Sequence, residues 1–297
     1  MTDMVRDGSR PVYLDYDQQR LDLNYNQTAW APNAAEIITW YREASLAAHA
    51  RLASTSLAYG ASSHERIDLF PTGVSGAPLV AYVHGGAWRL LDRMDSAYAA
   101  EAFVAAGINF AVIDFASIPA ARLPDMVTQV QRGILHLSRH AEGLGCDPGR
   151  LFVIGHSSGA HLVAAALSAA TSTSIGPGVV CGALCASGAY DLEGAMLSAR
   201  GAYLQLTSAE VDAFSPPRHA GRIRCPVTIA YGDGETEEYR RQAQAFHESL
   251  AAAGRPSELI VAEGQNHFEI SRTLTDPDGL LFKAAMRMIS AADGGGK

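Results

Sequence analysis

The chain has 297 residues, 48% of them hydrophobic and only 18% charged. This composition excludes a globally disordered chain, and the length fits one large α/β domain or at most two small ones. A chain of this size buries most of its apolar surface without disulfides or metal sites. The net charge is −8 and no block is rich in Lys and Arg, which argues against nucleic acid as a partner.

No apolar run reaches the length of a membrane span, and the first residues are polar, so we expect neither a membrane segment nor a secretory signal. Four cysteines follow no zinc-binding or redox spacing. They are Cys146, Cys181, Cys185 and Cys225. We therefore expect them to be buried thiols of a cytoplasmic protein that uses no metal and no cofactor.

Residues 1 to about 60 are predicted to form an N-terminal arm, in which the stretch 33–54 has helical apolar spacing. After the arm, short apolar runs alternate with longer amphipathic stretches. The predicted strands are 66–70, 79–83, 108–113, 151–154, 179–186, 226–231 and 257–261. The predicted helices are 96–106, 124–141, 158–170, 236–253 and 278–290.

The central strands are apolar throughout and alternate with helices. This pattern is typical of an α/β protein whose mostly parallel central sheet is covered by helices on both faces. Residues of about 190–224 interrupt the alternation and are predicted to form a short cap-like insertion. Insertions at the carboxyl edge of such a sheet often cover a site. We predict a single domain over residues 1–297.

The sharpest motif is Gly-His-Ser-Ser-Gly at residues 155–159, which follows an apolar strand and opens an alanine-rich helix. It has the G-x-S-x-G pattern in the strand–turn–helix context that the pattern requires. The turn is so tight that only small residues fit beside its apex, and the central side chain projects above the sheet edge. Ser157 is therefore the predicted nucleophile. The helix N-terminus beneath it supplies N–H groups, including that of Ser158, and a positive dipole end.

A second motif, His-Gly-Gly-Ala-Trp at residues 84–88, follows the strand 79–83. Adjacent glycines let the backbone approach a substrate closely and direct N–H groups toward it. In many lipases and esterases an HGG loop at this place donates N–H groups to the tetrahedral oxyanion. We therefore predict an oxyanion hole made by the N–H groups of Gly86, Ala87 and Ser158.

A seryl nucleophile needs a base, and the base needs an orienting acid. Four histidines follow Ser157 in the chain. His161 lies on the helix after the nucleophile, His219 lies in the insertion, and His247 lies inside a charged amphipathic helix. Only His267 lies in a loop after the last strand, which is where the base follows the acid in this chain order. His267 is the predicted base.

The acid is expected in the loop after the strand 226–231, where both Asp233 and Glu235 stand. Asp233 follows the strand so closely that it can be a structural residue of the turn instead. Glu235 stands at the tip of the loop just before the helix and is favoured. Asp191, after an earlier strand, is a third option whose alternative role is that of a turn residue.

The residues beside these motifs are candidates for other roles. His84 is predicted to hold the glycine loop in place rather than to act in catalysis. Trp88 is either a core residue or the wall of an aromatic-binding pocket. Trp88, His156 and Phe268 are the candidates for lining the substrate pocket.

The segments HGGAW, GHSSGAH and GQNHF make the chain resemble the α/β-hydrolase superfamily, and more narrowly the kynurenine formamidase (arylformamidase) group of serine hydrolases. Four stretches carry the closer resemblance: 23–26, 59–71, 232–242 and 266–270. The resemblance implies the α/β-hydrolase fold and acyl transfer through an acyl-enzyme. In that family the acid lies four residues before the aromatic residue of a D/E-x-x-E-F/Y-x-R-Q run, which is Glu235 here.

The chain departs from the family at Ala87, where an aromatic residue is usual, and at residues 114–119, which replace a Tyr-x-Leu-x-Pro segment. A small residue at 87 would widen the acyl pocket. The resemblance implies an arylformamide of the N-formylkynurenine type as substrate, with a general carboxylesterase or aryl-amide amidase using the same triad as the alternative. A binding module is disfavoured because all three triad elements are present. The arm either packs across a homodimer or covers its own domain.

Overall fold

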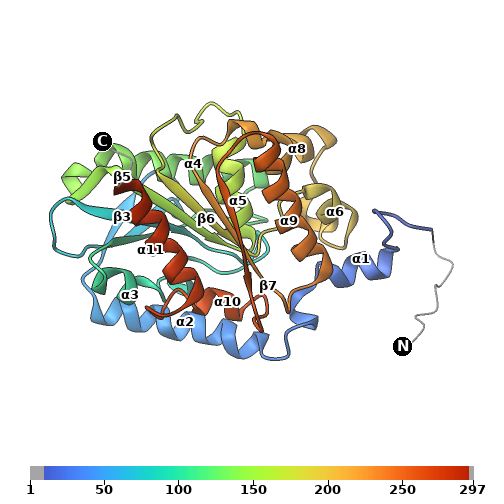
Figure 1. Cartoon of the computed structure of the whole chain (residues 1–297), viewed down its shortest axis with the longest axis horizontal. Coiled ribbons are helices and arrows are strands. Elements are labelled where there is room, and N and C mark those ends of the chain that lie inside the picture. Colours follow the sequence, from blue (N-terminus) through green and yellow to red (C-terminus); the bar gives the residue numbers. More distant parts are fainter. Residues whose placement is uncertain (1–9, 294–297) are drawn as a thin grey trace.

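The computed structural model describes residues 10–293, so the start of the predicted arm and the last four residues lie outside it. Its centre is an eight-stranded sheet of order β1-β2-β4-β3-β5-β6-β7-β8 (Figure 1). β2 pairs antiparallel with β1 and β4, and all other pairings are parallel. The strands are β1 (Thr55–Ala58), β2 (Arg66–Phe70), β3 (Ala77–Val83), β4 (Asn109–Ile113), β5 (Cys146–His156), β6 (Gly182–Ala186), β7 (Val227–Gly232) and β8 (Ser257–Ala262).

Helices cover both faces of the sheet, and each layer has its own apolar core (Figure 1). One face carries α4 (Leu123–His140), α5 (Ser158–Ser168) and α9 (Glu237–Ala252). The other carries α2 (Ala34–Arg51), α3 (Ala100–Ala105), α10 (Glu269–Arg272) and α11 (Leu280–Asp293). Because both faces are covered, β3 and β4 are buried along their whole length. This arrangement confirms the predicted α/β-hydrolase fold, with its mostly parallel sheet between helices.

Some boundaries differ from the predicted ones. β5 begins at Cys146 rather than at residue 151, because Cys146 pairs with Ala77 before a register shift. The intervening Asp-Pro-Gly sequence is typical of a turn, so the apolar pattern could not predict the pairing of Cys146 with Ala77. α3 covers only Ala100–Ala105 of the predicted 96–106, and residues 93–95 form a separate 3₁₀ turn.

The described part of the arm contains the short helix α1 (Gln18–Asn24), the 3₁₀ turn η1 (Gln27–Ala29) and the long helix α2. α1 begins at the cap residue Asp17, whose carboxylate accepts the Arg20 N–H at 2.8 Å. A helix of this length is too short to show a periodic pattern, which is why the sequence indicated only an arm with helical pieces.

The insertion after β6 forms four short helical segments: α6 (Leu192–Leu197), α7 (Gly201–Leu204), α8 (Ser208–Ala213) and η4 (Pro216–Arg222). They lie at the same end of the molecule as α1 (Figure 1). The Asp22 carboxylate accepts the Ala199 N–H at 2.6 Å, and the Arg200 guanidinium donates to the Tyr25 carbonyl. The arm therefore packs against the insertion of its own chain.

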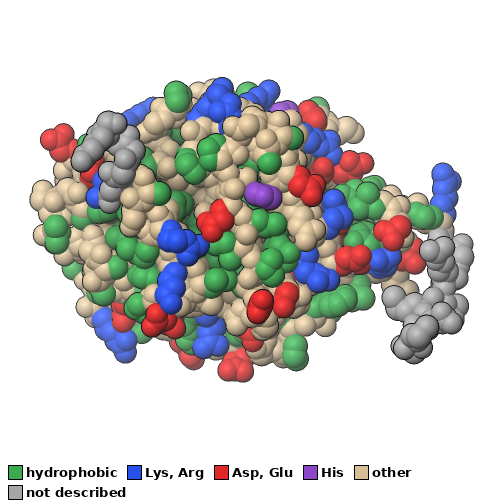
Figure 2. All heavy atoms as spheres, viewed as in Figure 1, with side chains coloured by type: hydrophobic (Ala, Val, Ile, Leu, Met, Phe, Trp, Pro, Cys, Tyr) green, Lys and Arg blue, Asp and Glu red, His purple; other side chains and the backbone are tan. Residues whose placement is uncertain are grey.

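On the face shown in Figure 2, acidic and basic side chains are interspersed and no continuous basic patch is visible. This distribution agrees with the acidic net charge of the chain. Among residues 10–293, no helix combines the length and the apolar composition that crossing a membrane requires.

Candidate active site

Ser157 lies at the sharp turn between β5 and α5, with φ 56° and ψ −126°. Such a backbone conformation costs a non-glycine residue about 1–3 kcal/mol and persists only where its surroundings enforce it. A Cβ on Gly155 would lie 2.5 Å from the Gly159 carbonyl oxygen, and a Cβ on Gly159 would lie 2.1 Å from the Val83 carbonyl oxygen. The turn therefore requires glycine on both sides of the Ser157 apex, as the motif predicts.

Ser157, His267 and Glu235 lie in one hydrogen-bonded line. Ser157 Oγ is 2.8 Å from His267 Nε2, and His267 Nδ1 is 2.9 Å from Glu235 Oε2. The three side chains follow the carboxyl ends of the parallel strands β5, β8 and β7. Their exposed fractions are 8%, 4% and 2%, so the polar line lies in a nearly dry environment where its electrostatic interactions are weakly screened.

The Glu235 carboxylate is held at both oxygens. Oε1 accepts the Ser187 hydroxyl at 2.6 Å and the Gly232 N–H at 2.8 Å. Because these two donors fix one oxygen, the other oxygen is directed at His267 Nδ1. Such an arrangement selects the tautomer in which Nδ1 carries the proton and Nε2 is free to accept one from serine.

The two other carboxylates considered as acids serve local structure instead. Asp233 is exposed, and its Oδ1 accepts the Gly264 N–H at 2.7 Å, which ties the loops after β7 and β8 together. Asp191 caps α6 by accepting the Glu193 N–H and pairs with Arg218. Neither carboxylate takes part in the line that contains His267.

The other histidines after the nucleophile also lie outside this line. His161 is buried between the Trp88 indole N–H, 3.3 Å from its Nδ1, and the Phe214 carbonyl, 2.9 Å from its Nε2. Burial lowers the pKa of His161 to about 4, so the ring stays neutral. His219 on η4 lies 2.8 Å from the Asp212 carbonyl oxygen of α8, and His247 on α9 lies 2.9 Å from the Ser257 hydroxyl of β8.

The glycine loop after β3 lies directly on the nucleophile turn. Three successive residues, Gly86, Ala87 and Trp88, have positive φ values of 109°, 53° and 61°. A Cβ on Gly86 would lie 1.9 Å from the Leu90 carbonyl oxygen, so this position requires glycine. The preceding Gly85 is also constrained, because its Cβ would lie only 3.0 Å from Ser157 Cβ.

Gly86 and Ala87 are half-exposed, and Ser158 is the first residue of α5. Within residues 10–293 the N–H groups of these three residues have no hydrogen-bond acceptor. Backbone donors left free beside a nucleophile are what an oxyanion hole requires. Two of the predicted oxyanion donors therefore lie in the loop that contacts the Ser157 turn, and the third lies on the residue that follows Ser157.

The glycine loop is anchored from behind by His84. Its Nδ1 lies 2.9 Å from the Gly85 carbonyl oxygen and its Nε2 lies 3.3 Å from Asp114 Oδ1. The ring stacks on Phe115 with centroids 4.3 Å apart, and Arg93 bonds the other Asp114 oxygen at 3.2 Å. These contacts agree with a structural role for His84.

The three pocket candidates lie in different environments. Trp88 is only 1% exposed, so it is a core residue rather than the wall of an aromatic-binding pocket. His156 is buried and its Nε2 lies 2.8 Å from the His267 carbonyl oxygen, while burial and the neighbouring His267 lower the pKa of His156 to about 3. Phe268 is half-buried, with its ring edge-on to His267 at 5.1 Å between centroids. Of the three, only Phe268 presents side-chain surface beside the base.

The structure also reveals contacts that the sequence did not indicate. Tyr239 lies edge-on to the His267 ring, with centroids 5.1 Å apart, and against the Arg200 guanidinium. Burial raises the pKa of Tyr239, an effect that the cation partly offsets, so its hydroxyl remains a neutral donor. Ser187, the partner of Glu235, follows the end of β6 with φ 59°. The position of Ser187 after the carboxyl end of a predicted strand was the one sequence signal that could have indicated this contact.

The arm braces the loop that carries Glu235. The Asn24 side chain accepts the Glu238 N–H at 3.0 Å, and the Asn24 carbonyl accepts the Thr236 hydroxyl at 2.8 Å. Gln27 donates to the same Thr236 hydroxyl at 2.7 Å. The Leu-Asn-Tyr-Asn segment of the arm therefore fixes the first turn of α9 immediately after Glu235.

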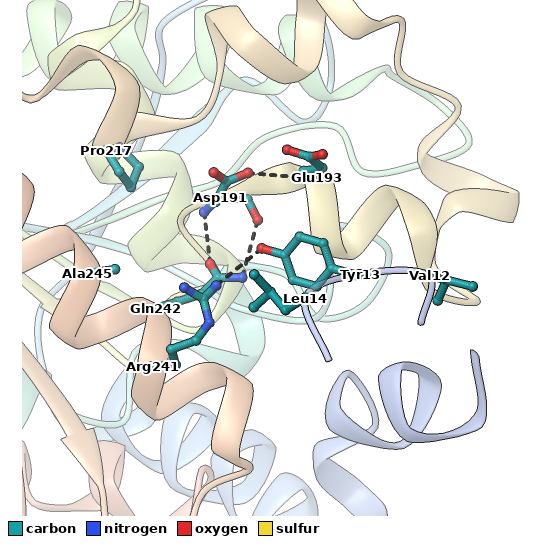
Figure 3. A pocket seen from close by; sticks show the side chains of 9 residues that line it. All are labelled: Val12, Tyr13, Leu14, Asp191, Glu193, Pro217, Arg241, Gln242 and Ala245. Carbon is teal, nitrogen blue, oxygen red and sulfur yellow. Dashed lines mark hydrogen bonds between the residues drawn. The ribbon is translucent and has the colours of Figure 1, made fainter. Parts of the chain in front are cut away.

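Two surface cavities border the arm. The first, of about 430 Å³, lies where the arm meets the insertion and α9 (Figure 3). Its two carboxylates, Asp191 and Glu193, both pair with Arg218. In it the Tyr13 hydroxyl accepts a hydrogen bond from Arg241 at 3.2 Å, and Gln242 accepts the Asp191 N–H (Figure 3). The second, of about 680 Å³, lies between α1 and α7 and includes Tyr25 and Arg200. Arg200 in its lining contacts Tyr239, whose ring packs on His267.

Among the residues that the structure describes, no group of three or more His, Cys, Asp and Glu side chains is arranged to hold a metal ion. The four cysteines are all unpaired, and three of them are buried.

Known proteins are similar to this chain over most of its length. The BD-FAE family model matches residues 67–178. A kynurenine formamidase from Danio rerio is 28% identical, covering 92% of this chain and 96% of that protein. An isoprenylcysteine α-carbonyl methylesterase from Arabidopsis thaliana is 27% identical, covering 81% of this chain and 63% of that protein. A solved carboxylesterase from a metagenomic library matches with a TM-score of 0.67 and 16% identity, covering 95% of this chain and 97% of that one.

Proposed function

Because the chain is a hydrolase of the α/β-hydrolase group that includes arylformamidases and esterases, we propose that Ser157, His267 and Glu235 are its catalytic triad. The observation that carries this proposal is the unbroken line from Ser157 Oγ through the imidazole to Glu235 Oε2. It joins a nucleophile, a base and an orienting acid in the order that acyl transfer needs.

In the acylation step Ser157 Oγ attacks the substrate carbonyl carbon and its proton passes to His267 Nε2. The Glu235 carboxylate, which accepts the Nδ1–H, stabilises the resulting imidazolium. The carbonyl oxygen becomes negative and is received by the N–H groups of Gly86, Ala87 and Ser158. Each preorganised donor of this kind lowers the barrier by about 3 kcal/mol.

The tetrahedral intermediate then collapses. The bond to the leaving nitrogen or oxygen breaks, and His267 gives its proton to the leaving amine or alcohol. An acyl ester remains on Ser157. Water attacks this ester, passes a proton to His267, and a second tetrahedral intermediate releases the carboxylic acid while Ser157 recovers its proton.

The substrate that this proposal favours is an arylformamide of the N-formylkynurenine type. It is supported by the similarity to kynurenine formamidases over nearly the whole chain. A formyl group is small enough to approach a nucleophile that is only 8% exposed. A general carboxylesterase or aryl-amide amidase is the second candidate. The small Ala87 side chain beside the oxyanion donors and the similarity to esterases favour it.

The test compares kcat/KM for N-formylkynurenine with kcat/KM for p-nitrophenyl acetate in the wild type and in Ser157→Ala. Ser168→Ala is a matched control, because Ser168 lies on the same helix and bonds only the Ala164 carbonyl. A formamide preference of orders of magnitude that Ser157→Ala abolishes supports the arylformamidase. Turnover of the ester alone supports the second candidate. Activity that survives Ser157→Ala contradicts the triad.

We further propose that the chain acts as a single domain in the cytoplasm and forms a homodimer through its arm. The unpaired cysteines agree with a reducing compartment. Five of the nine large hydrophobic side chains that are exposed in the described part of the chain lie in the arm: Val12, Leu14, Leu23, Trp30 and Leu46. Light scattering during size-exclusion chromatography tests the dimer, and a mass of 31.5 kDa would contradict it.

A further inference from the structure

The second cavity, of about 680 Å³, opens between the arm and the insertion. Its lining is unusual for an acidic chain because it includes two arginines. Two tyrosines, two alanines, a leucine, two side-chain amides and one carboxylate complete the lining.

The cavity is joined to the proposed catalytic residues by side-chain contacts. The Arg200 guanidinium carbon lies 5.5 Å from the centroid of the Tyr25 ring and 5.7 Å from that of Trp88. Trp88 donates its backbone N–H to Ser158 Oγ at 3.2 Å. On the other side Tyr239 contacts both Arg200 and the His267 ring. Arg200 is therefore separated from the base by one side chain.

Neither arginine of the cavity has a carboxylate partner among the described residues. Arg200 donates through Nε and Nη2 to the Tyr25 carbonyl oxygen, at 3.1 and 2.5 Å. Arg89 is exposed and lies over the Tyr203 ring, 4.6 Å from its centroid. These contacts orient the two cations but leave their charge uncompensated.

Asp22 is the one carboxylate in the lining, and it is already used as an acceptor. Its Oδ1 accepts the Ala199 N–H at 2.6 Å and the Gln18 amide at 3.0 Å. It thereby fastens the arm to the insertion. With two guanidinium groups against one carboxylate, the cavity is locally positive in a chain whose net charge is −8.

From this juxtaposition we infer that Arg200 and Arg89 bind a carboxylate on the leaving group of the substrate, and so select anionic aromatic amides or esters. This inference rests on the proposed acyl transfer at Ser157. A guanidinium held by its own hydrogen bonds presents its remaining N–H groups to a carboxylate in a fixed fork. The Tyr25 and Tyr203 rings supply apolar faces for an aromatic leaving group. The acyl group itself lies on the opposite side of the scissile bond.

The test uses two substrate pairs that differ only in charge. One pair is meta-formamidobenzoate and meta-formamidobenzamide, and the other is meta-acetoxybenzoate and meta-acetoxybenzamide. The measured quantity is the ratio of kcat/KM for the carboxylate to kcat/KM for the carboxamide. Competitive inhibition by benzoate against benzamide gives a second readout that does not depend on turnover. The variants are Arg200→Met and Arg89→Met. Arg139→Met, on the exposed end of α4, is the charge-matched control.

We expect the wild type to prefer the carboxylate in each pair that it hydrolyses, despite the repulsion that a chain of net charge −8 exerts on anions. Loss of a charged hydrogen bond in Arg200→Met should lower the ratio about 10- to 100-fold. Arg89→Met should lower it less, because its charge is exposed, and Arg139→Met should leave it unchanged. Added salt should lower the wild-type ratio.

A wild-type ratio of one or less, or an Arg200→Met ratio equal to that of the wild type, would overturn the inference. If only the ester pair is hydrolysed, the arylformamidase proposal fails. The ratio of kcat/KM for meta-acetoxybenzoate to that for meta-acetoxybenzamide then still tests whether the two arginines bind a carboxylate. If Arg200→Met does not fold, the Arg89→Met ratio and the salt dependence of benzoate inhibition decide it. Equal inhibition by benzoate and benzamide would then refute the subsite.

Discussion

Glu235→Gln should inactivate the enzyme while leaving its fold intact. Glu235 Oε1 accepts two hydrogen bonds, from the Ser187 hydroxyl and the Gly232 N–H. A glutamine placed there must keep its oxygen toward these donors, which turns its NH₂ group toward His267 Nδ1. Two donors cannot face each other, so the imidazole must move its proton to Nε2. Nε2 then cannot accept the proton of Ser157.

A triad with the wrong histidine tautomer loses roughly a factor of ten thousand in kcat, which corresponds to about 5.5 kcal/mol of activation free energy. We expect a loss of about a thousandfold or more for p-nitrophenyl acetate hydrolysis by Glu235→Gln. The thermal unfolding midpoint should change little, because the substitution preserves shape and keeps the two hydrogen bonds at Oε1.

Asp233→Asn is the matched control, since it makes the same chemical change two residues away on the same loop. Asp233 is exposed and accepts only the Gly264 N–H, which an asparagine oxygen can also accept. Its kcat should stay within about threefold of the wild type. A larger loss in Asp233→Asn than in Glu235→Gln, or a loss below tenfold in Glu235→Gln, would refute the assignment of the acid.

Three further predictions follow from the described contacts. Burial lowers the pKa values of His156 and His161 to about 3 and about 4, so near pH 5 these histidines bind protons only in the unfolded chain. The free energy of unfolding should therefore fall as the pH drops below 6.5, by about 2 kcal/mol for each histidine at pH 5. The free energy of unfolding in urea should depend less on pH in His161→Gln than in the wild type, and equal pH profiles would contradict this. Asn24→Ala removes the side-chain acceptor of the buried Glu238 N–H. It should lower the free energy of unfolding, measured by thermal denaturation, by about 1–3 kcal/mol, and it should also lower kcat. An unchanged kcat would disprove the bracing role. Gly86→Ala should lower kcat about a hundredfold, because its Cβ would clash within the loop that we propose to hold the oxyanion. Gly107→Ala, at a positive φ of 79° with open space, should keep its activity, and equal effects would argue against the loop's role.

The sheet and the motif residues could be predicted because their signals are local. Each parallel strand buried on both faces is a continuous apolar run, and the glycines around Ser157 and Gly86 are required by contacts within a few ångströms of the turn. His267 could be chosen by its place after the last strand. The loop after β7 offered both Asp233 and Glu235, and only the folded structure shows which one faces the imidazole.

The remaining features depend on tertiary packing, which no short pattern encodes. Ser187 reaches Glu235 from the end of β6, 48 residues earlier in the chain. Tyr239 lies in the first turn of α9, and only the fold shows that its ring packs on His267. Arg200 is brought to the cavity by a four-residue helix of the insertion, and Asn24 reaches α9 from the arm. Helices this short have no measurable apolar period, so their position and partners follow only from the contacts they make.

Covalent labelling of the nucleophile tests the central claim most directly. The protein would be treated with an aryl fluorophosphonate, which reacts with an activated serine by losing fluoride, and the adduct would be located by mass spectrometry of its peptides. We predict one adduct per chain on Ser157, loss of hydrolysis in proportion to labelling, and no adduct in Ser157→Ala or His267→Ala. An adduct on Ser158 or elsewhere, or full hydrolytic activity in the fully labelled protein, would contradict the triad.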